Sequence, residues 1–470
     1  MNPTFLRTAL GLGAMLGALV IPANSAARDD SAAIQPWPAN PWYWQYQGHP
    51  VFLAGGSDDD NLFQWPKEKL IAQLDLLQAC GGNYLRNTMS DRHDKGFELY
   101  PFRRLPNGKY DLGQWNDAYW QRFATFLDET EKRGIIVQIE VWDRFDYSRQ
   151  HWIPHPYNPK NNVNYTAKES GLAANYPNHP GMNRQPFFFT VPPLRNNQVV
   201  LKYQIRFVDK LLSYSLRHHN VLYCMDNETS AAPEWGAWWA RHIKERARAA
   251  GRRVCVTEMW DDWNLRGEQH RHTFDHPELY DFVDVSQNNQ KKGQVHWDNF
   301  QWVRRYLAAH PRPMNTVKTY GADTGRFGNT QDGLERLWRH ALGGAAAVRF
   351  HRPPSGLGLS PLAQASLRSL RLLERSVKLW DLQAGNRRLG DRAQNEAYLA
   401  SRSGRAFVVL FPRGGAVTLD LRDQPGAWQL RWLDVRRARI APPGPITGNQ
   451  RLPLKTPTPR GFWLAILTRP

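Results

Sequence analysis

Eight short apolar segments, each followed by a stretch suited to a helix, constrain the fold of this chain more than any other feature. The segments lie at residues 51–56, 83–87, 135–142, 221–226, 253–258, 282–286, 314–320 and 345–350. Apolar strands that alternate with helices are typical of parallel βα units, whose strands are buried on both faces. Eight such units in order favour an α/β fold of the closed (β/α)8 or TIM barrel type, and an open doubly wound sheet is the alternative.

The pattern changes after a helix predicted over residues 360–378. Five segments of alternating polarity follow at residues 397–401, 406–411, 416–421, 428–433 and 462–467, with Gly and Pro between them. This pattern predicts a small antiparallel β-sandwich. We therefore expect a barrel catalytic domain at residues 28–385 and a β-sandwich domain at residues 386–470.

Residues 1–27 have the features of a secretion signal peptide. Arg7 supplies the positive start, residues 8–22 form an apolar run, and Ala23, Ser25 and Ala27 offer a cleavage site. An uncleaved membrane anchor is the alternative, but the run is short for a bilayer span of about 20 residues. We expect a periplasmic or secreted protein with no transmembrane segment after signal removal.

The chain is strongly basic, with a net charge of +18 and a pI near 9.9. Such a charge favours anionic surfaces or substrates, although a generally basic surface without a recognition role explains it equally well. The expected export and the lack of a recognition module argue against a nucleic-acid partner. An acidic polysaccharide of the cell envelope or the extracellular space is the better candidate.

Two carboxylates at strand ends are the candidate catalytic residues. The strand at 221–226 stops at Asn227 and Glu228, and Glu258 ends the next strand. The carboxyl ends of barrel strands face the active site, and glycoside hydrolysis usually takes two carboxyl groups that flank the bond. We expect Glu228 to be the general acid and Glu258 the second carboxylate. Helix capping by Asn227 and Glu228 and a salt bridge to Glu258 are the structural alternatives.

Other strand ends carry residues that could bind substrate. The polar candidates are Asp58, Arg86, Asn87, Glu140, Asp143, Asn227, Asn288, His296, Lys318, Tyr320, His351 and Arg352. The aromatic candidates for stacking on sugar rings are Trp142, Trp260, Trp263 and Trp297. Arginines can hold a carboxylate or sulfate through two hydrogen bonds. For each residue, structural hydrogen bonding or core packing is the alternative role.

Two further regions permit more than one role. Asp261 and Asp262 follow Glu258 into a predicted loop, and the long loop at 146–197 is rich in aromatic residues. Its rings, among them Trp152 and Tyr157, could wall one end of a cleft or pack the loop onto the barrel.

No motif predicts a metal or a cofactor. The chain lacks the zinc-binding His-Glu-x-x-His spacing, and no Gly-x-Ser-x-Gly elbow follows a strand. Cys80, Cys224 and Cys255 show no Cys-x-x-Cys spacing, and we expect them to be buried apolar thiols.

With these residues identified, the chain resembles clan A of the glycoside hydrolases, and most of all the apiosidase-like or DUF4038-type barrels. The resemblance lies in Asn40-Pro-Trp-Tyr-Trp, in His49-Pro-Val-Phe-Leu-Ala-Gly-Gly56 and in the Asn227-Glu228 pair. Gly404-Arg-Ala-Phe-Val-Val-Leu, Trp432-Leu-Asp and Gly461-Phe-Trp-Leu resemble a domain named for collagen binding, a name that indicates nothing about collagen here.

The resemblance implies that Glu228, at the fourth strand end, is the acid/base residue. It also implies a glutamate nucleophile at the seventh strand end, where this chain has Lys318. A lysine cannot form a glycosyl ester, although it can hold a carboxylate ionised. Three explanations remain open: a different strand register, a partner such as Glu258, or a site without hydrolysis.

The sequence thus predicts an exported glycoside hydrolase that cleaves a poly- or oligosaccharide by carboxylate general acid/base catalysis. A non-catalytic glycan-binding protein on the same scaffold and a polysaccharide lyase are the alternatives. The sugar, the linkage and the oligomeric state stay open.

Overall fold

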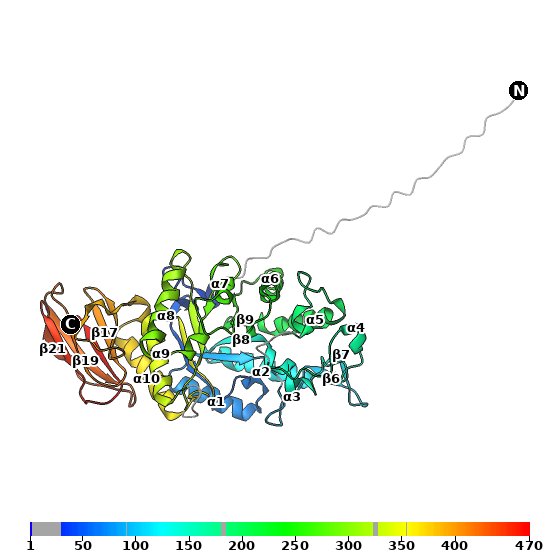
Figure 1. The fold of residues 1–470 in the computed structure, drawn as a ribbon, viewed down its shortest axis with the longest axis horizontal. Coiled ribbons are helices and arrows are strands. Elements are labelled where there is room, and N and C mark those ends of the chain that lie inside the picture. The colour runs from blue at the N-terminus through cyan, green and yellow to red at the C-terminus, as the bar shows by residue number, and fades with distance from the viewer. Residues whose placement is uncertain (2–29, 91, 180–184, 323–327, 354) are drawn as a thin grey trace.

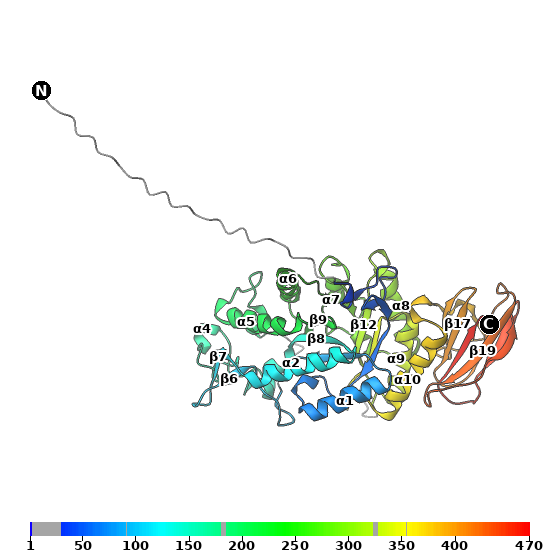
Figure 2. The same cartoon turned by 180° about the vertical axis from the view of Figure 1, so that it is seen from behind.

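The computed structural model describes residue 1 and residues 30–90, 92–179, 185–322, 328–353 and 355–470. The signal peptide expected at residues 1–27 therefore lies, apart from Met1, outside the described residues. Figures 1 and 2 show one large α/β unit with a smaller β unit at one end of the long axis. Within the described ranges, no helix combines the length and the apolar character that crossing a bilayer requires.

Eight parallel strands form one sheet, which confirms the predicted α/β barrel. In chain order they are β4 (Leu53–Gly56), β5 (Tyr84–Thr88), β8 (Ile136–Asp143), β9 (Val221–Asn227), β10 (Val256–Thr257), β11 (Val283–Asp284), β12 (Met314–Thr319) and β13 (Ala347–Phe350). Each strand pairs with its successor from β4 to β10 and from β11 to β13, and β13 pairs with β4. A hydrogen bond of 3.0 Å from Asp281 N, just before β11, to Val256 O in β10 links the two ends of the sheet.

Helices cover the outside of this barrel. They are α1 (Lys67–Ala79), α2 (Asp117–Lys132), α5 (Gln198–Ser215), α6 (Pro233–Ala249), α7 (Glu268–Phe274), α8 (Gly293–Tyr306), α9 (Thr330–Gly343) and α10 (Pro361–Ser376). Each long helix buries a stripe of apolar residues; in α2 it includes Tyr119, Phe123 and Leu127, four residues apart. A small sheet, β1 (Gln35–Pro36), β2 (Trp44–Tyr46) and β3 (His49–Val51), precedes the barrel.

The long connection between β8 and α5 packs onto the barrel. It contains α3 (Arg149–Trp152) and α4 (Ala167–Ser170), and it lies near the hairpin of β6 (Phe102–Arg104) and β7 (Tyr110–Trp115). Its rings Trp152, Tyr157, Phe187 and Phe188 are all buried. Burial of so many rings accounts for the aromatic content of this segment without a cleft.

The C-terminal region forms two antiparallel sheets, as predicted. The larger sheet holds β14 (Gln383–Ala384), β16 (Tyr398–Arg402), β17 (Ala406–Phe411), β23 (Trp463–Thr468), β19 (Ala427–Asp434), β20 (Arg439–Ile440) and β21 (Gly444–Thr447). The smaller sheet holds β15 (Leu389–Gly390), β18 (Ala416–Asp420) and β22 (Arg451–Lys455).

Strand β17 is buried on both faces and contributes side chains to the cores of both units. Phe407 and Val409 face the sandwich core, whereas Val408 and Leu410 belong to the core shared with the barrel. Helix α9 lies on that second face, and all its residues from Asp332 onward are buried. The alternating polarity expected for residues 406–411 is therefore wrong: β17 is a continuous apolar run, because both of its faces are buried.

Candidate active site

A pocket of about 500 Å³ opens at the carboxyl ends of the barrel strands. It is lined by Asp59, Asp60, Asn61, Arg86, Thr88, Ser90, Arg92, Asp94, Asp143, Phe145, His179, Asn227, Glu228, Asp261, Trp263, Gln290, Lys318, Tyr320, His351, Arg352 and Ser355. Strands β5, β8, β9, β12 and β13 and the segments that follow them supply most of this wall. The lining is mainly charged, so it suits a polar ligand better than an apolar one.

Glu228 is held in one position by three donors. Its Oε1 atom lies 2.7 Å from Lys318 Nζ and accepts hydrogen bonds of 3.1 Å from both Tyr320 Oη and Gln287 Nε2. Its backbone has φ of 57°, a left-handed conformation that non-glycine residues seldom adopt. Strain of this kind is concentrated at functional sites, where the surrounding contacts maintain it.

The charge of Lys318 decides the ionisation of Glu228. Burial by itself would raise the pKa of this carboxyl, but the charge and hydrogen bond of Lys318, with help from Arg86 and Tyr320, lower it to about 2. Glu228 is therefore a carboxylate at neutral pH and has no proton to donate.

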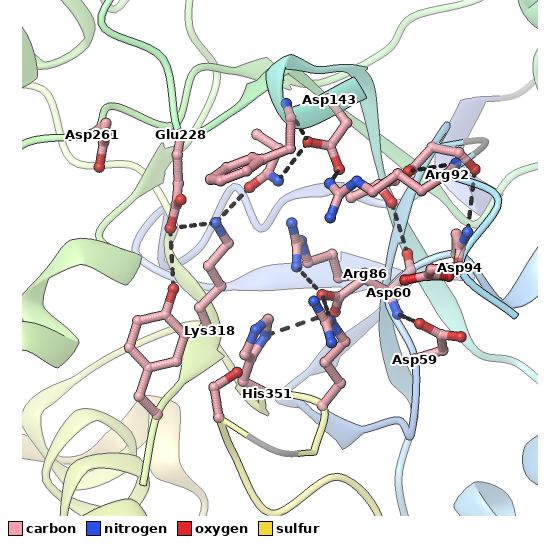
Figure 3. A pocket seen from close by; sticks show the side chains of 18 of the residues that line it. Asp59, Asp60, Arg86, Arg92, Asp94, Asp143, Glu228, Asp261, Lys318 and His351 are labelled. Atoms are coloured by element: carbon pink, nitrogen blue, oxygen red, sulfur yellow. Dashed lines mark hydrogen bonds and ion pairs between the residues drawn. The ribbon is translucent and has the colours of Figure 1, made fainter. Parts of the chain in front are cut away.

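Lys318 also connects Glu228 to a chain of polar groups across the pocket. Its Nζ donates to Asn227 Oδ1 at 2.5 Å, and Asn227 Nδ2 donates to Asp143 Oδ1 at 3.0 Å. Asp143 forms an ion pair with Arg92, which lies 2.8 Å from Asp146. Figure 3 shows this alternation of acidic and basic groups along the pocket wall.

A second charged cluster surrounds Asp60 on the opposite side of the pocket (Figure 3). Its carboxylate lies 2.8 Å from Arg86, 3.1 Å from Arg349 and 2.8 Å from Arg352. Burial raises the pKa of Asp60, yet these cations and His351 hold it well below the ordinary value. Arg86 additionally binds Glu140 at 2.7 Å, so this cluster fixes the side chain of Arg86 in place.

Asp261 is the pocket carboxyl that follows β10 in the sequence. Its backbone N donates to Thr229 O at 2.8 Å, which places Asp261 beside the residue that follows Glu228. The Arg144 guanidinium lies 3.9 Å from its carboxylate. Burial, followed by the negative charge of Glu228, raises the pKa of Asp261. Figure 3 shows Asp261 and Glu228 side by side at the pocket wall.

The structure does not bring Glu258 into this pocket. Its side chain is 1% exposed, and Oε1 accepts hydrogen bonds of 3.0 Å from the backbone N atoms of Asp226 and Met259. Its Oε2 lies so close to helix α6 that a Cβ atom on Gly236 would come within 2.0 Å. Glu258 therefore points toward the helical layer, where burial raises its pKa well above the ordinary value.

The other residues predicted from the sequence divide into two groups. Arg86, Asp143, Asn227, Glu228, Lys318, Tyr320, His351 and Arg352 line the pocket. Asp58, Asn87, Glu140, Trp142, Trp260, Asn288, His296 and Trp297 do not. Asp58 instead accepts a hydrogen bond of 2.8 Å from Leu359 N, and Glu140 is the buried partner of Arg86.

The predicted tryptophans are mostly core residues. Trp142, Trp260 and Trp297 are at most 3% exposed, whereas Trp263 is 51% exposed and lines the pocket. His296 and Asn288 lie by α8 and contact His340 rather than the pocket. Trp263 is thus the aromatic surface most open to a ligand.

Several pocket residues carry no strong sequence signal. Arg92 and Asp94 lie in the irregular segment after β5, and His179 lies in the long connection between β8 and α5. Within the described chain, no three His, Cys, Asp or Glu side chains are grouped so that they could hold a metal ion. Cys80, Cys224 and Cys255 are buried free thiols.

Comparison with solved structures shows the same architecture elsewhere. A structure described as a glycoside hydrolase family 5 protein from Bacteroides vulgatus ATCC 8482 matches with a TM-score of 0.64 and 11% identity, over 93% of this chain and 94% of that one. A second, described as a glycoside hydrolase, matches with a TM-score of 0.61 and 10% identity, over 93% of this chain and 97% of that one. No protein-family model and no curated protein matches the sequence. At this identity the likeness shows the fold alone.

Proposed function

We propose that this protein is a glycoside hydrolase whose active site is the pocket around Glu228. The observation that carries the proposal is the pair of Glu228 and Asp261, two pocket carboxyls that follow the neighbouring strands β9 and β10 and have pKa values shifted in opposite directions. Two carboxyls whose pKa values are shifted apart in this way suit the separate roles of carboxylate and acid that glycoside hydrolysis requires. The glycoside hydrolases that share the fold support the same reaction class.

In this proposal the roles differ from those expected from the sequence. Glu228, ionised through its contact with Lys318, faces the positive charge that develops at the anomeric carbon in the transition state. Asp261 donates the proton to the leaving oxygen, because its raised pKa keeps the proton available at higher pH than for an ordinary aspartate. Water then adds to the anomeric carbon and gives up a proton, which restores Asp261 to its acid form. Glu258 remains a structural carboxyl in the helical layer.

Substrate binding follows from the rest of the pocket wall. Trp263 offers a half-exposed ring for one sugar face, while Asp60, His351 and Arg352 offer hydrogen-bonding groups for hydroxyls on the opposite side. The pocket contains acidic as well as basic groups, so its own lining favours a polar sugar without requiring an anionic one.

The finer assignments from the sequence belong to the same proposal. They are the apiosidase-like or DUF4038-type subfamily, the collagen-binding-type name of the last domain, the barrel at residues 28–385, the sandwich at 386–470, and export through residues 1–27 to the periplasm or beyond. Their support is the set of motifs at 40–56, 404–410, 432–434 and 461–464 together with the basic, apolar and small residues of the N-terminus.

The test is product formation from a panel of oligo- and polysaccharides, read by reducing-sugar release and mass spectrometry. Glu228→Gln and Asp261→Asn should each abolish most of the turnover of a substrate found with the wild type. Asp262→Asn is the matched control, since Asp262 is adjacent but bonds Asn264 N at 2.8 Å instead of lining the pocket. Full turnover by Glu228→Gln would contradict the proposal.

The Lys318–Glu228 ion pair favours one second candidate, a glycan-binding protein without hydrolysis. If the protein only binds glycans, a glycan should bind in the pocket without forming any product. Its affinity should be the same before and after prolonged incubation with the protein. Isothermal titration calorimetry on the same panel, followed by mass spectrometry of the recovered glycan, separates the two functions.

A further inference from the structure

A second hollow lies between the barrel and the β-sandwich, away from the pocket around Glu228. It has a volume of about 660 Å³ and is lined by Gln331, Pro412, Arg413, Asp434, Arg436, Arg437, Thr458, Arg460, Gly461 and Trp463. We call it the arginine groove. It combines helix α9 with the loops after β17 and β19 and the start of β23.

The groove is strongly basic because four guanidinium groups line it with a single acid. That acid, Asp434, is already bonded to Arg436 N at 3.0 Å and to the Arg437 side chain at 2.9 Å. The Arg413 and Arg437 side chains remain 62% and 71% exposed despite their ion pairs. Arg460 is exposed and forms no ion pair with any residue that the structure describes.

The net charge of the whole sandwich is also strongly positive. Residues 386–470 contain fifteen Lys and Arg but only five Asp and Glu, so this short segment carries more than half of the net charge of +18. Such a field attracts polyanions, and exposed guanidinium groups can bind carboxylate or sulfate through two hydrogen bonds.

Trp463 gives the groove an apolar surface. Its indole N–H donates to Thr458 Oγ1 at 3.2 Å, and Trp432 packs behind it with ring centroids 6.4 Å apart. Both contacts fix the ring, which is only partly buried in the structure. A fixed aromatic ring beside arginines suits a ring-shaped ligand that carries negative charge.

The position of the groove relates it to the pocket. Helix α9 follows β12, so its first turn, with Gln331, begins at the carboxyl end of the barrel, where the pocket opens. We propose that the arginine groove binds an anionic polysaccharide, with acidic groups on the arginines and a sugar ring on Trp463. The choice of a glycan rests on the proposed function, since a polymer held there would supply the pocket.

The test measures binding directly, so an inactive protein still gives a clear answer. Isothermal titration calorimetry with the full chain would use polygalacturonate as the carboxylate probe, dextran sulfate as the sulfate probe, dextran as the neutral probe and single-stranded DNA as the competing polyanion. We expect binding of at least one anionic glycan, none of dextran, and weaker binding of DNA.

The variant Arg437→Gln/Arg460→Gln should lose about tenfold or more in affinity for that glycan, because each charge-assisted contact contributes that order of binding. The control Arg387→Gln/Arg451→Gln removes the same charge from exposed positions outside the groove and should change affinity much less. Circular dichroism would show that both variants are folded.

Three results would overturn the proposal: equal losses in the two double variants, tighter binding of DNA than of either anionic glycan, or no binding of any anionic glycan. Failure to find hydrolysis would instead contradict the function proposed for the pocket and leave the binding result standing.

Discussion

Lys318 is the residue on which the charge of Glu228 depends, and its replacement is the most direct test of that dependence. In Lys318→Gln the pKa of Glu228 should rise clearly from about 2, since burial is then opposed only by the charge of Arg86 and by the remaining hydrogen bonds. Carbon-13 NMR of the labelled carboxyl would follow the titration. A pKa that stays near 2 would mean that Tyr320, Gln287 and Arg86 suffice.

The same shift affects stability in a defined pH range. The pKa of Glu228 is lower in the folded chain than the value of about 4.3 for an unperturbed glutamate. Its contribution to the free energy of unfolding is therefore present above about pH 4.3 and is lost as the pH falls toward 2. Lys318→Gln should weaken that part of the acid dependence in urea titrations.

Asp261 provides the second prediction for a single residue. If it protonates the leaving oxygen, Asp261→Asn should slow hydrolysis of unactivated glycosides by about 10²–10⁴-fold. Hydrolysis of aryl glycosides with strongly acidic leaving groups should be slowed much less, because such leaving groups depart without being protonated. Equal losses on both kinds of substrate would assign Asp261 to binding or folding instead, and Asp262→Asn serves as the control.

Asp261 should also reduce stability at neutral pH. Its pKa is raised in the folded chain, so the folded state binds the proton more tightly and loses stability as the pH rises above the unfolded value. Asp261→Asn should consequently raise the melting temperature at pH 7 while it lowers activity, which differential scanning fluorimetry can measure. An active-site carboxyl commonly has such a cost.

At the scale of elements, the sequence predicts the strands and helices well but the pairing of carboxylates poorly. The order of apolar and helical segments suffices for the barrel, because strand burial and helix amphipathicity are local patterns. The direction of Glu258 is not local. Strand β10 has only two residues, and beyond it Trp260 forms an isolated β-bridge with Thr229. This bridge places Asp261, rather than Glu258, at the pocket.

The dependence on tertiary contacts also explains why most of the predicted tryptophans do not line the pocket. Trp142 lies within β8 and Trp260 shortly after β10, and both are buried, whereas Trp263 lies far enough into a loop to escape the packing of the helices. Arg92 and Asp94 reach the pocket from a segment that has no regular periodicity. Sequence spacing cannot place such residues, because their positions depend on tertiary contacts.

Helix α6 supplies a prediction for the buried Glu258. Gly→Ala inside a helix normally stabilises a protein by about 1 kcal/mol. Gly236→Ala should instead destabilise this chain, because the new methyl group would approach Glu258 Oε2 to 2.0 Å while two backbone N–H groups hold that carboxyl. Urea denaturation would measure the change. In a Glu258→Ala background the same substitution should no longer destabilise, and identical effects in both backgrounds would contradict the contact.

For the whole molecule, the shared core predicts that barrel and sandwich unfold together. Strand β17 contributes alternate residues to two cores, and the buried Glu335 forms ion pairs with the buried Arg339 and with the exposed Arg413, which ties α9 to the loop after β17. Calorimetry should therefore show a single transition for the full chain.

The control for this prediction is a substitution on the shared face. Leu410 lies on the side of β17 that faces the barrel, and Leu410→Ala should lower the free energy of unfolding by about 2–5 kcal/mol. That loss should lower the one transition without splitting it, since both units depend on the same contacts. Two separate transitions in the wild type, or a variant in which only the sandwich melts earlier, would mean that the larger sheet folds independently of α9.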